Sequence, residues 1–404
     1  MTPAAALPHA ASDQKIGVLF LMIQMAMGGS ERLILNLVRN LDRRIFEPSI
    51  GWFSGERLLP EFEALSVPLY YIPKRRRFDW AAMRQLAAII RTQRIDVVNA
   101  HHFMPFFYAY CGTKIANRAR LVYTEHSEAD VLAARGRWRT IGGYMLRSSD
   151  LAIGVSPRVS QTLGSHFGLD PRTIRTIENG VDVELFGDNG NDRERLRQDL
   201  GFSPTDVIIG SVANFRRNKN HLFLLRAFHE VARHRDDVKL VLVGQGFPGD
   251  PENSEPEVTR FIQSTGLSKS VRMLGYRSDV HDLMRMIDVF CLVSYKEGLP
   301  LSLIEAMASG LPVVGTDIEG MRAVIEPETN GLVAAPDDVA VLTHALNRLI
   351  AAPALRQRMG QASRRLAAEK YSLRRCVQET QDVFLSLVPD VTMLDGATRL
   401  RLET

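Results

Sequence analysis

The sequence predicts an α/β protein of two domains, each with a parallel sheet covered by helices. Its 404 residues exceed what a single hydrophobic core usually supports. Short apolar, β-prone runs alternate with helical patterns along the whole chain, and this alternation is typical of parallel sheets. A polar stretch rich in Gly, Asn and Asp at 187–193 separates the two halves. We therefore expect one domain on each side of this stretch.

The composition, 45% hydrophobic and 24% charged, is typical of a soluble globular protein. Residues 1–14 are rich in Ala and Pro but lack a basic start and a long apolar core, so they predict a disordered leader rather than a signal peptide. No 18 apolar residues run together. The three cysteines, Cys111, Cys291 and Cys376, are widely spaced and odd in number, which favours a reducing compartment and a cytoplasmic location.

The first half contains seven short β-type runs. Helical patterns lie at 33–41, 80–91 and 159–167, and Ser30 and Ser156 are expected N-caps. The expected strands are 15–21, 49–53, 69–72, 95–102, 121–126, 151–156 and 173–177.

A glycine turn and three histidines mark ligand candidates in this half. Gly28 and Gly29 follow the first strand, where they allow a ligand to approach the main chain. One strand ends in His101 and His102, and another ends in His126. A histidine at the carboxyl end of a strand can donate a hydrogen bond or shuttle a proton. On this local evidence alone, a structural role for the histidines remains the better interpretation.

The second half repeats the alternation of strands and helices. Its first strand leads into a loop with Arg216, Arg217 and Lys219, three cations that can either pair with a diphosphate or lie on an exposed surface. A later strand ends in the glycine turn at Gly244. Helical patterns are expected at 222–231, 303–308 and 366–388. The expected strands are 207–212, 239–246 with its glycine turn, 271–277, 289–293, 313–317 and 331–333.

The stretch 294–305 carries the strongest functional signal. It holds two carboxylates, Glu297 and Glu305, with Gly298 and Pro300 between them, and it lies between an apolar strand and a helix-forming run. Glu297 is therefore expected in a turn beside a helix N-terminus, where free backbone N–H groups near Leu299 and Leu301 favour a phosphate. Glu305, roughly two turns further along, can accept hydrogen bonds from sugar hydroxyls.

This stretch, with Gly-Leu-Pro inside it and Ala-Met-Ala-Ser-Gly after it, resembles the E-x7-E signature of retaining glycosyltransferases of family four. The Asn-Gly-Val-Asp run at 179–182 resembles the end of the family's N-terminal domain, and the likeness spans roughly 15–388. It implies the GT-B fold, in which two Rossmann-like domains face each other across a cleft and a C-terminal helix crosses back. The implied division is a leader 1–14, an acceptor domain 15–185, a nucleotide-sugar domain 186–370, a crossover helix 371–390 and a tail 391–404.

The resemblance also implies roles for single residues. Arg216 and Lys219 would stabilise the leaving diphosphate, with Arg216 chosen because Ala213-Asn214 replaces the family's usual Gly-Arg. Glu297 would hold the donor sugar and Glu305 the ribose, and His101 would lie near the reacting centre, with His102 and His126 kept as alternatives. The further donor-binding candidates are Gly28, Gly29, Gly244, Tyr276, Arg277, Gly298, Leu299, Pro300 and Leu301. No Asp-x-Asp lies at a strand end, so no metal and no other cofactor is expected.

The expected partners are a nucleotide-sugar donor, with uridine favoured as the base, and a saccharide or lipid-linked acceptor. The implied activity is that of a hexosyltransferase in cell-surface polysaccharide or glycolipid synthesis. Residues 1–185 carry 23 Lys and Arg against 17 Asp and Glu, and the basic cluster 74–77 lies beside Phe78 and Trp80. This cluster fits the anionic inner face of a membrane about as well as it fits a solvated loop. No aromatic-interleaved basic motif recurs, so nucleic acid is not expected.

Two alternatives stay open. A nucleotide-sugar epimerase of the same architecture would need an added acid and base in the cleft. A non-catalytic protein that binds anionic surfaces would use the basic half and would keep its function without Glu297 or Lys219. Release of nucleotide without an acceptor product would favour the epimerase, whereas steep salt dependence would favour the surface-binding protein.

Overall fold

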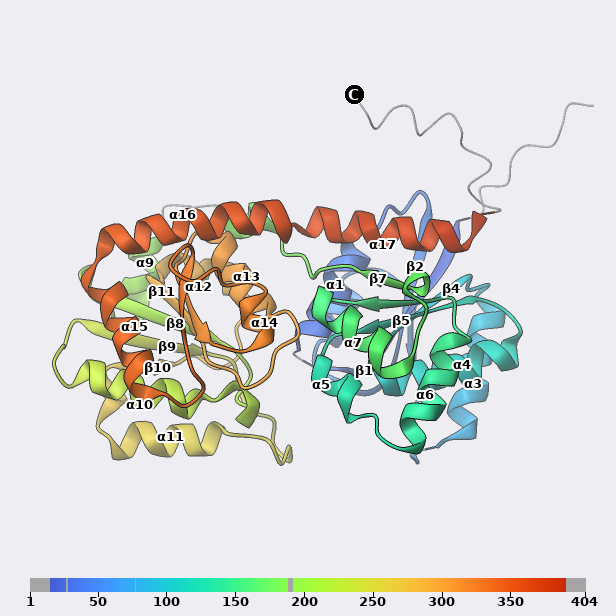
Figure 1. The fold of residues 1–404 in the computed structure, drawn as a ribbon, viewed down its shortest axis with the longest axis horizontal. Helices are drawn as coiled ribbons and strands as arrows, with labels where there is room; N and C mark the ends of the chain where they lie inside the picture. The colour runs from blue at the N-terminus through green and yellow to red at the C-terminus, as the bar shows by residue number, and fades with distance from the viewer. Residues whose placement is uncertain (1–14, 27, 77, 188–191, 390–404) are drawn as a thin grey trace, which may run out of the picture.

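The computed structural model describes residues 15–26, 28–76, 78–187 and 192–389, and it has two α/β domains side by side (Figure 1). The N-terminal domain has a seven-stranded sheet in the order β3-β2-β1-β4-β5-β6-β7, and its strands pair in parallel. The strands are β1 Ile16–Met25, β2 Phe46–Glu56, β3 Leu69–Tyr71, β4 Val97–His101, β5 Arg120–Glu125, β6 Leu151–Gly154 and β7 Ile174–Thr176.

The C-terminal domain repeats this plan with six parallel strands in the order β10-β9-β8-β11-β12-β13. They are β8 Val207–Val212, β9 Val238–Val243, β10 Val271–Met273, β11 Val289–Leu292, β12 Val313–Thr316 and β13 Gly331–Ala334. In both sheets the strand order reverses beside the first strand, so β1 and β4, and likewise β8 and β11, are neighbours. Ligands of open α/β sheets bind beyond the strand ends at such a reversal.

Helices cover both faces of each sheet, and their apolar side chains pack against the strands. In the N-terminal domain they are α1 Gly29–Asn40, α2 Leu59–Glu63, α3 Trp80–Thr92, α4 Phe103–Ala116, α5 Glu128–Ala133, α6 Arg137–Arg147 and α7 Pro157–Phe167. After α8 Val183–Gly187, the C-terminal domain has α9 Arg193–Asp199, α10 His221–Ala232, α11 Glu255–Ser264, α12 Val280–Met286, α13 Leu301–Ala308, α14 Glu319–Arg322, α15 Val339–Ala351 and α16 Pro353–Lys370. The final helix of the described chain is α17 Leu373–Leu387.

The hydrophobic core has one part that continues across the two domains. It runs from β1 and α1 through α17 to α13 and α16, whereas two further clusters fill the opposite face of each sheet. This continuity anchors both domains along one side of the molecule.

The two domains are joined by two chain segments that pair with each other. Val181 donates its N–H to the carbonyl of Tyr371 at 2.9 Å and accepts the N–H of Leu373 at 2.8 Å. Between them, Ser372 caps α17 by accepting the N–H of Arg375. In Figure 1, α16 lies on the C-terminal domain and α17 on the N-terminal one. The single helix predicted over 366–388 is therefore wrong, because the chain is extended at Ser372 where it crosses.

Two of the predicted caps have different outcomes. Ser156 accepts the N–H of Val159, as predicted. Ser30 is not the N-cap of α1, because the helix already begins at Gly29 and Gly28 occupies the cap position. The Ser30 hydroxyl instead donates to the carboxylate of Glu31 at 2.9 Å.

In the part of the chain that the structure describes, no helix is both long enough and apolar enough to span a membrane. The three cysteines are unpaired thiols, two of them buried. The predicted leader 1–14 and tail 391–404 lie outside the described residues.

Candidate functional site

Lys219 and Glu297 form the central ion pair of the C-terminal domain. The Nζ atom of Lys219 lies 2.5 Å from Oε1 of Glu297, and the same oxygen accepts the hydroxyl of Ser294 at 2.5 Å. Lys219 ends the 3₁₀ turn after β8, and Glu297 lies in the loop after β11. Because β8 and β11 pair in the sheet, two residues 78 positions apart meet at its carboxyl edge. Their side chains are only 23% and 11% exposed.

The two arginines beside Lys219 are held by different acids. Nε of Arg216 lies 3.2 Å from the Asp250 carboxylate, and Arg217 lies 2.9 Å from Glu257 of α11. Both side chains remain about half exposed. Arg216 also acts electrostatically on Asp130 of the N-terminal domain, which places it on the side of the facing domain.

The turn 297–301 is packed against the N-terminal domain. A Cβ on Gly298 would lie 1.8 Å from the carbonyl oxygen of His126, so only glycine allows this approach. The carbonyl of Leu299 accepts the amide of Asn179 at 3.2 Å. Pro300 then takes the cap position of α13, which begins at Leu301. Both ends of the turn therefore lie at the seam between the domains.

The glycine turn before α1 reaches the same seam. A Cβ on Gly29 would lie 3.8 Å from a methyl group of Leu301, so the N-termini of α1 and α13 lie close together. A Cβ on Gly28 would lie 2.3 Å from the Glu31 carboxylate. Glu31 is 7% exposed, and burial raises the pKa of its carboxyl. Two helix N-termini that converge in this way favour an anion between them.

Glu305 projects from α13 and is half-buried. Burial raises its pKa to about 7, although the charge of Arg32 partly opposes this rise. Arg32, from α1, donates to Glu61 at 2.7 Å and to the Tyr276 hydroxyl at 3.4 Å. The Tyr276 hydroxyl in turn donates to Glu61 at 2.6 Å. Arg32, Glu61 and Tyr276 therefore form a contact between the two domains, which we call the interdomain triad.

Two further predicted donor-binding residues lie nearby in the C-terminal domain. Arg277 is paired with Asp279 rather than with another domain. Gly244 has a φ of +136°, and a Cβ there would lie 2.0 Å from the carbonyl oxygen of Ala213, so glycine is required for the approach of the two loops. Their contact with a nucleotide stays a prediction.

His101 is part of a buried network. Its Nε2 lies 2.8 Å from Oδ1 of Asn99, and its Nδ1 lies 2.8 Å from Nε2 of His126. The side chain is 1% exposed, and burial lowers its pKa to about 3. Since both ring nitrogens are engaged within the protein, this arrangement does not support the predicted contact of His101 with a substrate. His126, which is only partly buried, lies closer to the domain seam.

His102 belongs to a charged group beside this network. Its backbone φ is +69°, and its Nδ1 lies 3.7 Å from Glu125 and 3.8 Å from Asp130. Burial lowers its pKa, but Glu125, Glu31 and Asp130 together raise it above the ordinary value. His102 and these acids therefore act as an ion-pair network.

The ligand atoms of His102, Glu125 and Asp130 lie within 4.8 Å of one another and could surround a cation. However, Glu125 already accepts the hydroxyl of Tyr123 and the N–H groups of His126 and Ser127. Its oxygens are therefore committed within the protein, and the contacts fit an ion-pair network better than a metal centre.

Sequence reasoning missed the supporting residues Ser294, Asn99, Glu125 and Arg32. Ser294, Asn99 and Glu125 bond to partners within three residues, but a single polar residue in such a stretch carries no distinctive local pattern. Arg32 bonds to Glu61 and Tyr276 far along the chain, and only its place shortly after the glycine turn carried a positional signal.

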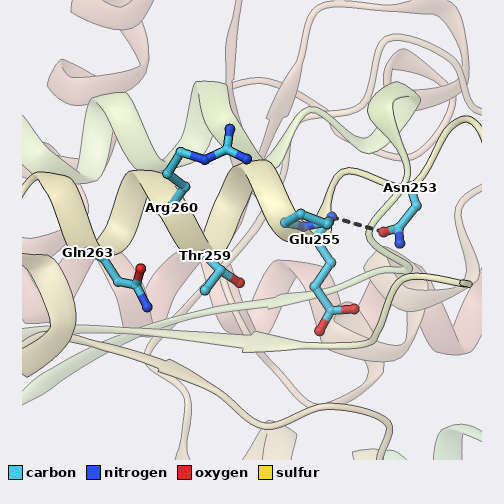
Figure 2. Close-up of a pocket in the computed structure, with 6 residues that line it drawn as sticks. Asn253, Glu255, Thr259, Arg260 and Gln263 are labelled. Atoms are coloured by element: carbon cyan, nitrogen blue, oxygen red, sulfur yellow. Dashed lines mark hydrogen bonds between the residues drawn. The ribbon is translucent and has the colours of Figure 1, made fainter.

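A surface hollow on α11 is separate from this site. Figure 2 shows its lining, in which the N–H of Glu255 donates to Asn253 at 3.0 Å. None of the predicted site residues lines it; the lining is Asn253, Glu255, Pro256, Thr259, Arg260 and Gln263.

Comparison with known proteins gives matches over both domains. The family model "Glycosyltransferase Family 4" matches residues 27–185, and "Glycosyl transferases group 1" matches residues 192–366. The chain is 24% identical to N-acetyl-alpha-D-glucosaminyl L-malate synthase of Bacillus anthracis, over 81% of this chain and 84% of the relative. It is 22% identical to UDP-Gal:alpha-D-GlcNAc-diphosphoundecaprenol alpha-1,3-galactosyltransferase of Escherichia coli, over 93% and 98%.

Among solved structures, Anabaena Alr3699/HepE in complex with UDP-glucose superposes with a TM-score of 0.80. The sequence identity is 20%, and the match covers 92% of this chain and all of the other. At this identity the likeness shows the fold.

Proposed function

Because the chain belongs to glycosyltransferase family 4 and has the GT-B fold, we propose that it transfers a hexose from a nucleotide diphosphate sugar, with UDP as the favoured carrier, to a saccharide or lipid-linked acceptor. The transfer retains the anomeric configuration. The transfer is a step in the synthesis of a cell-surface polysaccharide or glycolipid. The observation that carries this proposal is the Lys219–Glu297 pair at the carboxyl edge of the second sheet, beside the N-terminus of α13.

In this proposal the diphosphate lies between the cations and the helix N-termini. Lys219 and Arg216 stabilise the negative charge that grows on the leaving group. The N–H groups at the start of α13, near Leu301, add a positive potential at the same place. Glu297 releases Lys219 to the phosphate and holds hydroxyls of the donor sugar.

The remaining donor contacts extend along α13 and the neighbouring loops. Glu305 accepts hydrogen bonds from the ribose, and its pKa of about 7 lets it serve as acid or carboxylate near neutral pH. Tyr276 and Arg277 lie beside the base. Gly29 leaves room for the main chain to approach the donor, and Gly28, Gly244 and Gly298 let the protein segments around the donor pack closely.

No metal or other cofactor is needed in the proposed reaction. Lys219, Arg216 and the two convergent helix N-termini supply the positive charge that a divalent cation would otherwise supply. Transfer that is unaffected by excess chelator would support this part of the proposal, and loss of transfer restored by Mg²⁺ would contradict it.

The acceptor side is proposed to lie at the inner face of a membrane. Trp80 and Tyr144 of the N-terminal domain are 63% and 62% exposed, and Phe78 stacks on Trp138 with ring centres 5.8 Å apart. Basic residues lie beside them at 74–76 and at Arg137. Exposed aromatic rings among cations suit an anionic membrane surface and a lipid-linked acceptor. Sedimentation with anionic but not neutral vesicles, lost at high salt, would support this location.

The first test is the thermal shift of the purified protein with UDP, GDP and ADP in the absence of metal. A nucleotide at 100 times its dissociation constant should stabilise the fold by about 2.7 kcal/mol. We expect one base to give a shift that Lys219→Ala removes. If no nucleotide stabilises the wild-type protein at millimolar concentration, the donor site is refuted and binding to anionic surfaces becomes the better function.

The second test identifies the reaction. The favoured sugar nucleotide is incubated with candidate acceptors, and the anomeric configuration of the product is read by NMR. An acceptor product with the donor's configuration is expected. Release of nucleotide with free or epimerised sugar and no acceptor product would instead indicate an epimerase.

A further inference from the structure

Four polar side chains of the N-terminal domain, three of them buried, form a continuous row of hydrogen bonds, which we call the histidine relay: Thr124, Asn99, His101 and His126. Nδ2 of Asn99 donates to Oγ1 of Thr124 at 2.8 Å. The two further links, from Asn99 to His101 and from His101 to His126, are also 2.8 Å long. Three of the four side chains are at most 4% exposed, and the row ends at the partly exposed His126.

The orientation of the Asn99 amide sets the direction in which the relay donates. Because the amide nitrogen of Asn99 faces Thr124, its oxygen faces His101 and accepts the proton on Nε2. His101 is neutral near pH 7, since burial and the nearby His102 lower its pKa to about 3. A neutral imidazole carries one N–H, so Nδ1 of His101 has a lone pair and accepts from Nε2 of His126.

The same reasoning determines the free end of the relay. Burial, and then the charges of His102 and His101, lower the pKa of His126 well below the ordinary value. Neutral His126, with its proton on Nε2, has a lone pair on Nδ1. The charge of His102 acts on His126 directly, and Glu125 accepts the main-chain N–H of His126 at 2.7 Å. His102 in turn faces Glu125, Glu31 and Asp130, and Lys296 and Arg216 of the other domain act on Asp130. Its carbonyl oxygen packs against Gly298, directly after Glu297.

We propose that Asn99 is a positioning residue that acts through His101 to hold the proton of His126 on Nε2, so that Nδ1 of His126 accepts a hydrogen bond from a substrate hydroxyl. The contact with substrate rests on the proposed function, whereas the position of the proton does not. In this role Asn99 resembles any group that fixes a histidine tautomer from its far side. The buried His101 transmits the effect and does not touch the substrate.

The decisive measurement is the tautomer of His126 in the wild-type protein. Histidine labelled with nitrogen isotopes gives long-range proton–nitrogen NMR spectra that distinguish protonated from unprotonated ring nitrogens, and His126→Gln assigns the signal. At about pH 8, above the ordinary histidine pKa, we expect the proton of both His101 and His126 on Nε2. A proton on Nδ1 of His126 would overturn the proposal whether or not the protein transfers sugar.

Two variants test the role of Asn99. Asn99→Leu removes the acceptor, so His101 is expected to move its proton to Nδ1 and donate to His126, which reverses the relay. Asn99→Asp keeps an acceptor oxygen and should preserve the wild-type tautomers at about pH 8. If the tautomer of His126 is the same in a folded Asn99→Leu protein as in wild type, Asn99 does not set it.

Kinetics separate positioning from a merely structural role. Loss of one hydrogen bond to the reacting substrate should lower kcat/KM of Asn99→Leu roughly tenfold, with the UDP-induced thermal shift unchanged. Asn99→Asp should recover most of the loss. Equal loss in both variants with wild-type tautomers would contradict the proposal, while a wild-type protein with no transfer at all would contradict the proposed function and leave the tautomer result standing.

Discussion

The two sides of the candidate site are built on different principles. On the C-terminal side, Lys219 and Glu297 are charged, partly exposed and paired at 2.5 Å across a sheet edge. On the N-terminal side, His101 is neutral and buried, and both its nitrogens bond to protein groups. A partly exposed ion pair at a sheet edge can exchange its partner for a ligand, whereas a buried neutral relay keeps its geometry. The first side is therefore suited to bind a charged diphosphate, and the second to orient a neutral hydroxyl.

Among the changes that would test this difference between the two sides, Lys219→Ala is expected to have the largest effect. Removing a cation from a developing diphosphate charge should lower kcat by roughly 10²- to 10³-fold, as for other groups that stabilise a transition-state anion. Steady-state transfer assays measure this loss. Lys370→Ala is the matched control, because Lys370 forms a surface pair with Glu326 at 3.1 Å in the same domain. Equal activity of the two variants would show that the Lys219–Glu297 ion pair has no role in catalysis.

The next effect concerns the pH dependence of stability through Glu305. Its folded pKa of about 7 exceeds the ordinary value of 4.5, so the folded state binds this proton more tightly. The free energy of unfolding should therefore fall as the pH rises from the unfolded to the folded pKa, by at most roughly 3 kcal/mol. In Glu305→Gln this fall should be absent, so the variant gains stability relative to wild type as the pH rises.

Urea unfolding of both proteins between about pH 5 and pH 8 measures this difference, and Glu326→Gln on the surface serves as the control. A constant difference between wild type and Glu305→Gln across this range would contradict the raised pKa of the Glu305 carboxyl.

A smaller effect distinguishes the two neighbouring arginines. Arg216→Ala should lower kcat roughly tenfold, because its charge-assisted bonds to phosphate are lost. Arg217→Ala should change kcat less, since Arg217 is held by Glu257 on α11. The two variants remove the same charge from adjacent positions, so each controls for the other. A larger loss in Arg217→Ala would transfer the phosphate role to that residue.

The smallest effect is expected at the interdomain triad, where the two sides meet. Tyr276→Phe removes the hydroxyl that donates to Glu61 at 2.6 Å, which should cost about 1 kcal/mol and raise KM for the donor a few-fold. Tyr295→Phe is the control, because the Tyr295 hydroxyl donates to Asp337 within one domain. If both variants shift the melting temperature but neither changes KM, the triad contributes only to stability.

The charged side of the site was more predictable than the histidine side, for a physical reason. Glu297, Gly298 and Pro300 form a short local pattern with a turn and a helix start, and the Lys219 loop follows a clear buried strand. Which histidine approaches the seam depends on packing between β4 and β5, and no spacing in the sequence reports it. The N-cap at Ser30 was wrong because α1 begins at Gly29, and the single helix over 366–388 was wrong because the chain is extended at Ser372 beside Val181.

The two parallel α/β domains and the E-x7-E turn follow from the sequence alone. These follow from local periodicity and from residues whose backbone preferences are fixed, such as glycine at a turn. Only the tertiary structure decided that Ser372 breaks the crossover helix, that Arg32 and Glu61 reach Tyr276, and that Asn99 and His126 occupy both nitrogens of His101. The contacts of Arg32 with Tyr276 and of His101 with His126 join residues far apart in the chain, and the geometry of all these contacts depends on burial that no local pattern encodes.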